Sequence, residues 1–298
     1  RTASADPTRA LRKRLRVEGI IGESPVLAGV LEQIAVVAPL DVSVLLTGDS
    51  GTGKTQVARA IHDNGPRRSG PFVEINCAAL PENLVESELF GAFPGAHSQA
   101  VRRIEGKISA ANGGTLFLDE VGELRPAIQA KLLQFLQSRE YYPLGSNKPI
   151  RADVRLIAAT NMDLKAAVAG KDFRKDLYYR LQVLALRLPS LAERKTDIPL
   201  LVRHFCEQAE KIHKLPRLTI SPGALRAVEA AEWPGNVRQL AHAIEVAAIR
   251  AAGEGSLEIS PRHVFNAALG AAGPGAAGQP AAARLSLQVI VAIALGTA

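Results

Sequence analysis

The octet at residues 48–55 reads Gly48-Asp49-Ser50-Gly51-Thr52-Gly53-Lys54-Thr55, and it lies between the apolar run 44–46 and a helix-like stretch. Phosphate groups are bound by backbone N–H donors that no side chain obstructs, which explains the glycines. Lys54 supplies a positive charge for the β- and γ-phosphates, and the Thr55 hydroxyl supplies a ligand for Mg²⁺. A glycine-rich turn is the alternative interpretation. The strand before the octet and the helix after it favour a phosphate loop, which predicts a nucleoside triphosphate site.

Two carboxylates follow a second apolar run. Gly113 and Gly114 precede the run 115–118, and Asp119 and Glu120 come directly after it. Such a run is typical of a buried parallel strand. At phosphoryl-transfer sites one carboxylate holds Mg²⁺ and an adjacent acid can polarise the attacking water. We therefore assign Asp119 to the metal and Glu120 to the water. An acidic helix cap would explain one carboxylate, but it does not explain two in succession.

The order of predicted elements alternates between strand and helix up to residue 189, as a parallel sheet requires. The predicted strands cover residues 42–47, 72–76, 114–118, 153–159 and 182–187. The predicted helices cover residues 26–37, 53–63, 82–90, 125–139 and 163–169. Turn residues within 141–151 predict a hairpin. These patterns predict an α/β fold, a parallel sheet flanked by helices.

Beyond Pro189 the strand pattern stops, and four helices are predicted, at 196–210, 221–231, 236–251 and 260–268. They predict a small all-helical lid domain. Residues 269–284 are rich in Ala, Gly and Pro and are typical of a linker. The predicted organisation is a basic linker at 1–19, an α/β nucleotide-binding domain at 20–188, the helical domain at 189–268, and a linker with an apolar tail at 269–298.

Composition supports a compact protein and excludes several classes. The chain has 298 residues, of which 47% are hydrophobic, so it can form one large core and a smaller one. Cys77 and Cys206 lie far apart and suggest neither a disulfide nor a zinc site, which fits a reduced, cytoplasmic compartment. We expect no membrane span and no secretory signal.

The beginning of the chain is basic. The net charge is +7, and residues 1–19 contain six basic and two acidic side chains. This arm could contact nucleic acid, but basic runs alone specify no partner, and we favour a solvated linker helix.

Further segments occur in a characteristic order along the chain. They are Ile21-Gly22-Glu23-Ser24, Asn76-Cys77-Ala78-Ala79, Val85 to Gly91, Gly113 to Glu120, Ala158-Ala159-Thr160-Asn161, Phe173 to Leu181, and Trp233-Pro234-Gly235-Asn236-Val237-Arg238. With the phosphate loop, they make residues 20 to about 250 resemble the central AAA+ domain of bacterial enhancer-binding proteins. Members of that family are ATPases that remodel sigma-54 RNA polymerase. The resemblance implies ATP and Mg²⁺ as cofactors.

The resemblance also implies roles for single residues. Ile21 would line the adenine pocket, which needs an apolar wall. Asn76 would be the switch amide that can hold Glu120. Asn161, after Thr160, would be the first sensor. Arg238, in the helical domain, would be the second sensor, because a guanidinium can pair with phosphate in a bidentate way.

Two arginines match the arginine fingers of the family. Arg174 and Arg180 would reach the γ-phosphate of a neighbouring subunit, which implies a hexameric or heptameric ring whose isolated protomers hydrolyse ATP poorly. A spacing of six does not place both residues on one face of an ideal helix, so we expect a turn or break between them. An ion pair with Asp172 or Asp176 is the alternative for either arginine.

The loop by which the family contacts sigma-54 has the pattern Gly-Ala-Phe-Thr-Gly-Ala. A gapped alignment places it on residues 91–96, with Pro94 in place of Thr. An alignment without gaps, which we prefer, places it on Gly95-Ala96-His97-Ser98-Gln99-Ala100. In that alignment His97 offers less apolar contact than Phe, and Gln99 lacks the freedom of glycine.

Three functions remain open from the sequence. The first is an ATP-hydrolysing transcription regulator that forms a ring and remodels sigma-54 RNA polymerase through the variant loop. The second is a regulator of the same architecture that acts independently of sigma-54, with ATP controlling oligomerisation. The third is a non-catalytic nucleotide-binding module. We expect contact with DNA only through a domain that these residues do not contain.

Overall fold

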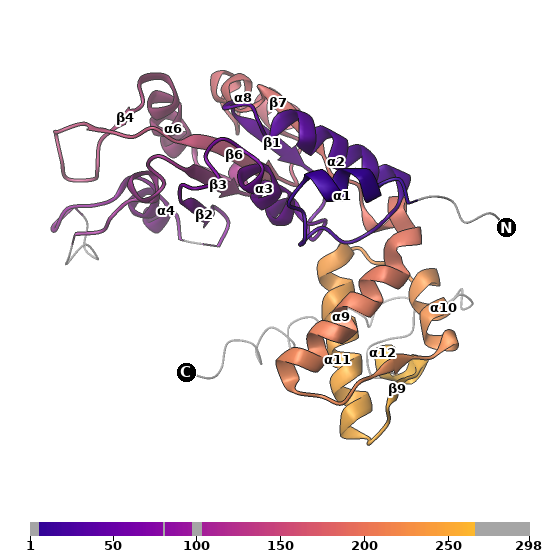
Figure 1. The fold of residues 1–298 in the computed structure, drawn as a ribbon. Coiled ribbons are helices and arrows are strands. Elements are labelled where there is room, and N and C mark those ends of the chain that lie inside the picture. The colour runs from indigo at the N-terminus through magenta and orange to yellow at the C-terminus, as the bar shows by residue number, and fades with distance from the viewer. Residues whose placement is uncertain (1–5, 80, 97–102, 266–298) are drawn as a thin grey trace. The chain divides into compact units, whose positions relative to one another are not determined.

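The computed structural model describes residues 6–79, 81–96 and 103–265, and the chain divides into two units (Figure 1). The first unit contains residues 1–197 together with Gly235–Arg238, and the second contains 198–234 and 239–298. The predicted tail at 269–298 lies outside the described residues. Within the described ranges, no helix has both the length and the apolar character needed to cross a bilayer.

A parallel five-stranded sheet forms the centre of the first unit. Its strand order is β2-β3-β6-β1-β7. The strands are β1 (Val44–Thr47), β2 (Phe72–Asn76), β3 (Thr115–Asp119), β6 (Arg155–Thr160) and β7 (Leu184–Arg187). Each overlaps its predicted range, which confirms the predicted parallel sheet.

Helices surround this sheet. They are α1 (Arg9–Arg14), α2 (Pro25–Val37), α3 (Lys54–Asp63), α4 (Glu82–Phe90), α5 (Lys107–Ala110), α6 (Pro126–Ser138), α7 (Leu164–Ala169) and α8 (Lys175–Leu181), with short 3₁₀ segments η1 (Val121–Glu123) and η2 (Leu191–Asp197). The predicted hairpin is confirmed as the antiparallel pair β4 (Glu140–Tyr141) and β5 (Ile150–Arg151).

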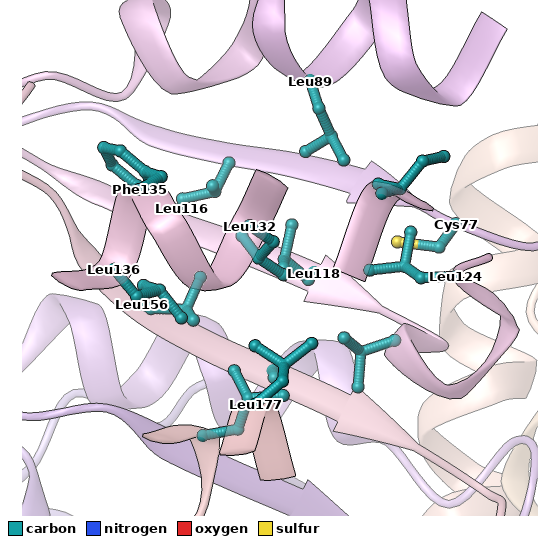
Figure 2. Close-up of a cluster of buried hydrophobic side chains, with 14 of the residues drawn as sticks. Cys77, Leu89, Leu116, Leu118, Leu124, Leu132, Phe135, Leu136, Leu156 and Leu177 are labelled. Carbon is teal, nitrogen blue, oxygen red and sulfur yellow. The ribbon is translucent and has the colours of Figure 1, made fainter. Parts of the chain in front are cut away.

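The two faces of the sheet are covered by different helices, because successive strand residues point to opposite faces. Leu116 and Leu118 of β3 belong to a buried cluster with residues of α4, α6 and α8 (Figure 2). Phe117, between them, belongs to a second cluster with residues of α2 and α3. Burial of one such side chain stabilises the fold by about 1.5–3 kcal/mol. Covering on both faces explains why the central strands β1, β3 and β6 are nearly continuous apolar runs rather than alternating ones.

The parallel register brings the strand ends that carry polar residues to one edge of the sheet. Thr47 at the end of β1 lies opposite Thr160 at the end of β6. Asn76 at the end of β2 lies opposite Asp119 at the end of β3. The segments that follow these four residues therefore meet at the same edge, which is where ligands bind in open α/β sheets.

The second unit is mainly helical. Its helices are α9 (Ile198–His213), α10 (Pro222–Ala230), most of α11 (Asn236–Gly253) and α12 (Pro261–Val264). It differs from the all-helical expectation by one parallel pair, β8 (Thr219–Ile220) with β9 (Glu258–Ile259). Strands of two residues are too short to produce a period-2 pattern, so the sequence does not reveal them.

Candidate functional site

The phosphate loop connects β1 to α3, and the side chain of Lys54, the first residue of α3, reaches back to the start of the loop. Lys54 is buried, and its Nζ donates hydrogen bonds to the carbonyl oxygens of Gly48 at 2.8 Å and Asp49 at 3.3 Å. The same Nζ lies 3.4 Å from a carboxylate oxygen of Glu120. Thr55 is the second residue of α3, whose first N–H groups have no partner within the helix. The loop therefore presents a cation and free backbone donors at one place, as phosphate binding requires.

Glu120 has an unusual backbone conformation at the end of β3. Its φ of 53° and ψ of 51° lie in the left-handed region, which non-glycine residues rarely adopt. One carboxylate oxygen of Glu120 is near Lys54, and the other accepts a 3.0 Å hydrogen bond from the backbone N–H of Asn161. Glu120 thus contacts two other residues that the sequence predicted for the site, Lys54 and Asn161.

Asp119 is almost fully buried beside Glu120. Burial and the neighbouring Glu120 carboxylate raise the pKa of Asp119, and Lys54 partly opposes this rise. In the part of the chain described by the structure, no group of three or more His, Cys, Asp or Glu residues could hold a metal ion. Mg²⁺ commonly uses one or two carboxylates together with phosphate oxygens and water. The donor pair Thr55 and Asp119 fits a Mg²⁺ that binds together with nucleotide phosphates.

Asn76 lies beside Asp119 on the neighbouring strand. Its Oδ1 accepts hydrogen bonds from the N–H groups of Ala78 at 2.9 Å and Ala79 at 3.1 Å. These bonds form a tight turn after β2. In the described structure the side-chain oxygen of Asn76 is therefore used by its own turn, and Glu120 contacts Lys54 and Asn161 instead.

The segment Gly235–Arg238 lies against the phosphate loop, within the first unit. Arg238 Nη1 donates a 3.2 Å hydrogen bond to the hydroxyl of Ser50. Asn236 Nδ2 donates to the Ser50 carbonyl at 3.0 Å, and Asn236 Oδ1 accepts from the N–H of Leu191 at 2.7 Å. Asn236 is a contact that sequence reasoning missed. Its place in the segment Trp233 to Arg238 was the only available signal.

Arg194 is a second residue that the sequence did not single out. It is 5% exposed, and its Nη2 donates a 3.1 Å hydrogen bond to the carbonyl of Thr52 in the phosphate loop. The charged run 193–195 is typical of a solvated surface, so nothing in the sequence indicated that its central arginine is buried.

Ile21, the predicted adenine-pocket residue, is half-buried, and the carbonyl groups of its two neighbours in the chain are hydrogen-bonded to Arg12. Arg12 Nη1 donates to the carbonyl of Ile20 at 2.8 Å, and Arg12 Nη2 donates to that of Gly22 at 2.6 Å. The expectation of a solvated basic arm is therefore wrong for Arg12, although the arm does form the helix α1. A bidentate guanidinium fixes the backbone on both sides of Ile21.

The two candidate fingers lie at opposite ends of α8, and both are exposed. Arg174 occupies the N-cap position of the helix, and its side chain forms a 2.7 Å ion pair with Asp176. Arg180 Nη2 donates to the carbonyl of Leu136 at 3.0 Å. Residues 175–181 form one uninterrupted helix, and its start lies between the two arginines. Arg174 has an extended backbone just before the helix, so the spacing rule for residues inside a helix does not apply to it.

The candidate partner loop has a paired base. Ala92 forms an antiparallel bridge with Ile104, with N–H to carbonyl distances of 3.0 and 2.8 Å. The hairpin residue Leu144 adds a third segment, because it accepts from the N–H of Phe93 and donates to the carbonyl of Gly91, each at 2.9 Å. Residues 91–93 therefore belong to the base and are not available as the tip of a loop.

Two glycines allow the two sides of this base to come close together. A Cβ on Gly106 would lie 2.5 Å from the backbone nitrogen of Gly91, so no larger residue fits there without a shift. Gly95 and Ala96 lie beyond the base. The other residues of the predicted partner loop lie outside the described residues: His97, Ser98, Gln99 and Ala100.

Two family models match the chain. The model described as the sigma-54 interaction domain matches residues 20–187, and the model described as the AAA+ ATPase lid domain matches residues 192–276. The first alone covers more than half of the chain.

Curated relatives and solved structures agree with these models. The chain is 53% identical over 228 residues to transcriptional regulatory protein GlrR of Escherichia coli (strain K12), covering 76% of this chain and 51% of the relative. It is 49% identical over 252 residues to the Nif-specific regulatory protein of Bradyrhizobium diazoefficiens, covering 85% of this chain and 43% of the relative. The chain therefore spans about half the length of the curated relatives it matches.

Among solved structures, NtrX from Brucella abortus in complex with ATP resembles the chain with a TM-score of 0.79 at 33% identity. The match covers 96% of this chain and 61% of that chain.

The first prediction separates nucleotide binding from turnover. Lys54→Ala removes the buried cation and should abolish ATP binding in calorimetry. Glu120→Gln should keep ATP binding but lower phosphate release by about 10²–10⁴-fold, because the amide cannot accept a proton from water. The matched control is Glu123→Gln, an exposed acid three residues further along the chain, which should behave like wild type. Normal turnover by Glu120→Gln would refute the role of Glu120.

The second prediction concerns the raised pKa of Asp119. A pKa that is higher in the folded than in the unfolded state means that ionised Asp119 destabilises the fold when no metal is bound. In EDTA, Asp119→Asn should therefore raise the Tm at about pH 8, and the gain should shrink as the pH is lowered and the wild-type carboxyl becomes protonated. The same substitution should weaken Mg²⁺-dependent hydrolysis. A lower Tm for Asp119→Asn at neutral pH would contradict the assignment.

Proposed function

The chain belongs to the family of sigma-54 interaction domains of bacterial transcription regulators, and on this premise we propose that it is the ATP-hydrolysing part of a ring-forming regulator that remodels sigma-54 RNA polymerase. The observation that carries the proposal is the contact of Lys54 with Glu120 and of Glu120 with Asn161 at the edge of the sheet. We place the protein in the bacterial cytoplasm, and the free, buried Cys77 and Cys206 are compatible with a reducing compartment.

In this proposal the residues at the sheet edge divide the chemistry of ATP hydrolysis among them. Lys54 and the first N–H groups of α3 hold the β- and γ-phosphates, and Glu120 accepts a proton from the attacking water. Thr55 and Asp119 hold Mg²⁺, which neutralises charge on the phosphate oxygens when it is bound. The ion pair between Lys54 and Glu120 must open as the γ-phosphate takes the place of the carboxylate beside Nζ. The products are ADP and phosphate.

Arg174 and Arg180 supply positive charge to the γ-phosphate of a neighbouring subunit in this proposal. Both side chains are exposed at the two ends of α8, which supports a role outside their own subunit. A phosphate would replace Asp176 as the partner of Arg174, because a bidentate contact with phosphate has the same geometry as one with a carboxylate. A guanidinium at the transferred phosphoryl group stabilises the charge of the transition state.

The loop that contacts sigma-54 is proposed to be Gly95–Ala100, as in the alignment without gaps. Its support is the loop base, in which Ala92 pairs with Ile104 and residues 91–93 bond to Leu144. A backbone that is already paired is poorly suited to insert into a partner. The gapped alignment would place half of the contact pattern in this paired base.

The third prediction tests whether the fingers act between subunits. Lys54→Ala subunits retain fingers but cannot bind ATP, and Arg174→Ala subunits bind ATP but lack a finger. Each variant alone should be nearly inactive, and mixing them should restore part of the ATPase activity, because intact sites then face intact fingers. Mixtures of Lys54→Ala with Glu120→Gln are the control and should stay inactive. Absence of recovery with Arg174→Ala would mean that the finger does not act in trans.

The fourth prediction concerns the variant loop. With ADP and a metal-fluoride transition-state analogue, the chain should form a complex with purified sigma-54 that is lost in His97→Ala. The double variant His97→Phe with Ser98→Thr restores the family pattern and should strengthen the complex, because Phe adds apolar contact area. Lys165→Ala, at an exposed position on α7, is the control. No complex with an intact ATPase would refute the sigma-54 role.

A further inference from the structure

Gln129 is a polar residue at a fully buried position of α6. Its exposed fraction is 0%, and apolar side chains surround this part of the helix. Buried amides are tolerated where their hydrogen-bonding groups find partners. Gln129 satisfies this condition with three backbone groups from two different segments.

One of these segments follows the carboxylates Asp119 and Glu120. Gln129 Nε2 donates a 2.7 Å hydrogen bond to the carbonyl of Leu124, which ends the short turn η1. The N–H of Glu123, in that turn, donates to the carbonyl of Glu120 at 3.0 Å. Gln129 is therefore connected to the hydrolytic carboxylate through one tight turn.

The other segment carries Arg174. Gln129 Nε2 also donates to the carbonyl of Asp172 at 2.9 Å, and Gln129 Oε1 accepts a 2.8 Å hydrogen bond from the N–H of Arg174. The N-cap position of a helix has backbone dihedral angles that the helix itself does not impose. The buried Gln129 amide bonds to the backbone on both sides of Phe173, and these bonds restrict the backbone at Arg174 where the helix does not.

We infer that Gln129 is a positioning residue that fixes the backbone from which the Arg174 finger projects. The inference rests on the proposed role of Arg174 between subunits and extends it to a residue of the core. Rigid support matters for a finger because a displacement of about 1 Å at a reacting group can lower a rate by about 10²-fold. Gln129 itself does not touch nucleotide in this role.

The contact with Leu124 suggests a competing role, in which Gln129 supports Glu120 in its own subunit. In the proposed ring, each ATP site combines Glu120 of one subunit with Arg174 of its neighbour. Loss of support for Arg174 damages the ATP site of the neighbouring subunit, whereas loss of support for Glu120 damages the ATP site of the same subunit. Subunit mixing distinguishes the two roles.

The test uses Gln129→Met in the full chain, a substitution of similar length that lacks the three hydrogen bonds. Alone, it should lower kcat by about 10²-fold and leave the KM for ATP unchanged, because the phosphate loop is intact. Mixed with Lys54→Ala, it should recover activity as Arg174→Ala does. Mixed with Arg174→Ala, it should stay inactive, since no subunit then supplies a correctly placed finger.

The opposite mixing pattern, recovery with Arg174→Ala and none with Lys54→Ala, would overturn the inference in favour of support for Glu120. An unchanged kcat in Gln129→Met would also overturn it. If Arg174→Ala itself fails to complement Lys54→Ala, the proposed function has failed independently, and the inference fails with it.

Two further variants guard against a loss of folding. Leu133→Ala removes a buried side chain from the same helix, and it should lower the Tm while keeping kcat. Gln129→Glu keeps an oxygen acceptor for the N–H of Arg174, and its carboxyl, which burial favours in the protonated form, can donate to one of the two carbonyl groups. It should therefore retain more activity than Gln129→Met. Loss of kcat in Leu133→Ala to the same degree, or no advantage of Gln129→Glu, would indicate a purely structural role and overturn the inference.

Discussion

The site depends on one constraint, the parallel direction of the five strands. The carboxyl ends of parallel strands lie at one edge of the sheet, so residues far apart in the sequence become neighbours along that edge. The order β2-β3-β6-β1 places Asn76, Asp119, Thr160 and the phosphate loop side by side. Helices on both faces keep water from the central strands β1, β3 and β6, whose polar chemistry is therefore confined to their carboxyl ends.

Much of this arrangement was predictable because it rests on local patterns. Continuous apolar runs indicated the buried strands, and the octet ending in Lys54-Thr55 indicated the phosphate loop. Asp119 and Glu120 followed from their position directly after such a run. The contact between Glu120 and Lys54 follows in turn from the parallel order of the strands.

The remaining features depend on tertiary contacts that leave no periodic signal. Arg194 lies in a charged run typical of a surface, and only the fold brings it to the phosphate loop. Gln129 lies in a helix of the core, and only the fold brings it to Arg174. The sequence indicated a turn or break between Arg174 and Arg180 but not its place, because a helix start has no periodic signal that fixes it to one residue. The anchoring role of Arg12 was missed because a basic run gives no indication of which member is bonded.

The bridge between Ala92 and Ile104 also bears on how such a protein can diversify. The pairing is made by backbone groups, which do not depend on side-chain identity. A substitution in the sequence between these two residues therefore leaves the donors and acceptors of the bridge in place. Under the proposed function, this lets the partner surface change in evolution while the residues at the sheet edge stay the same.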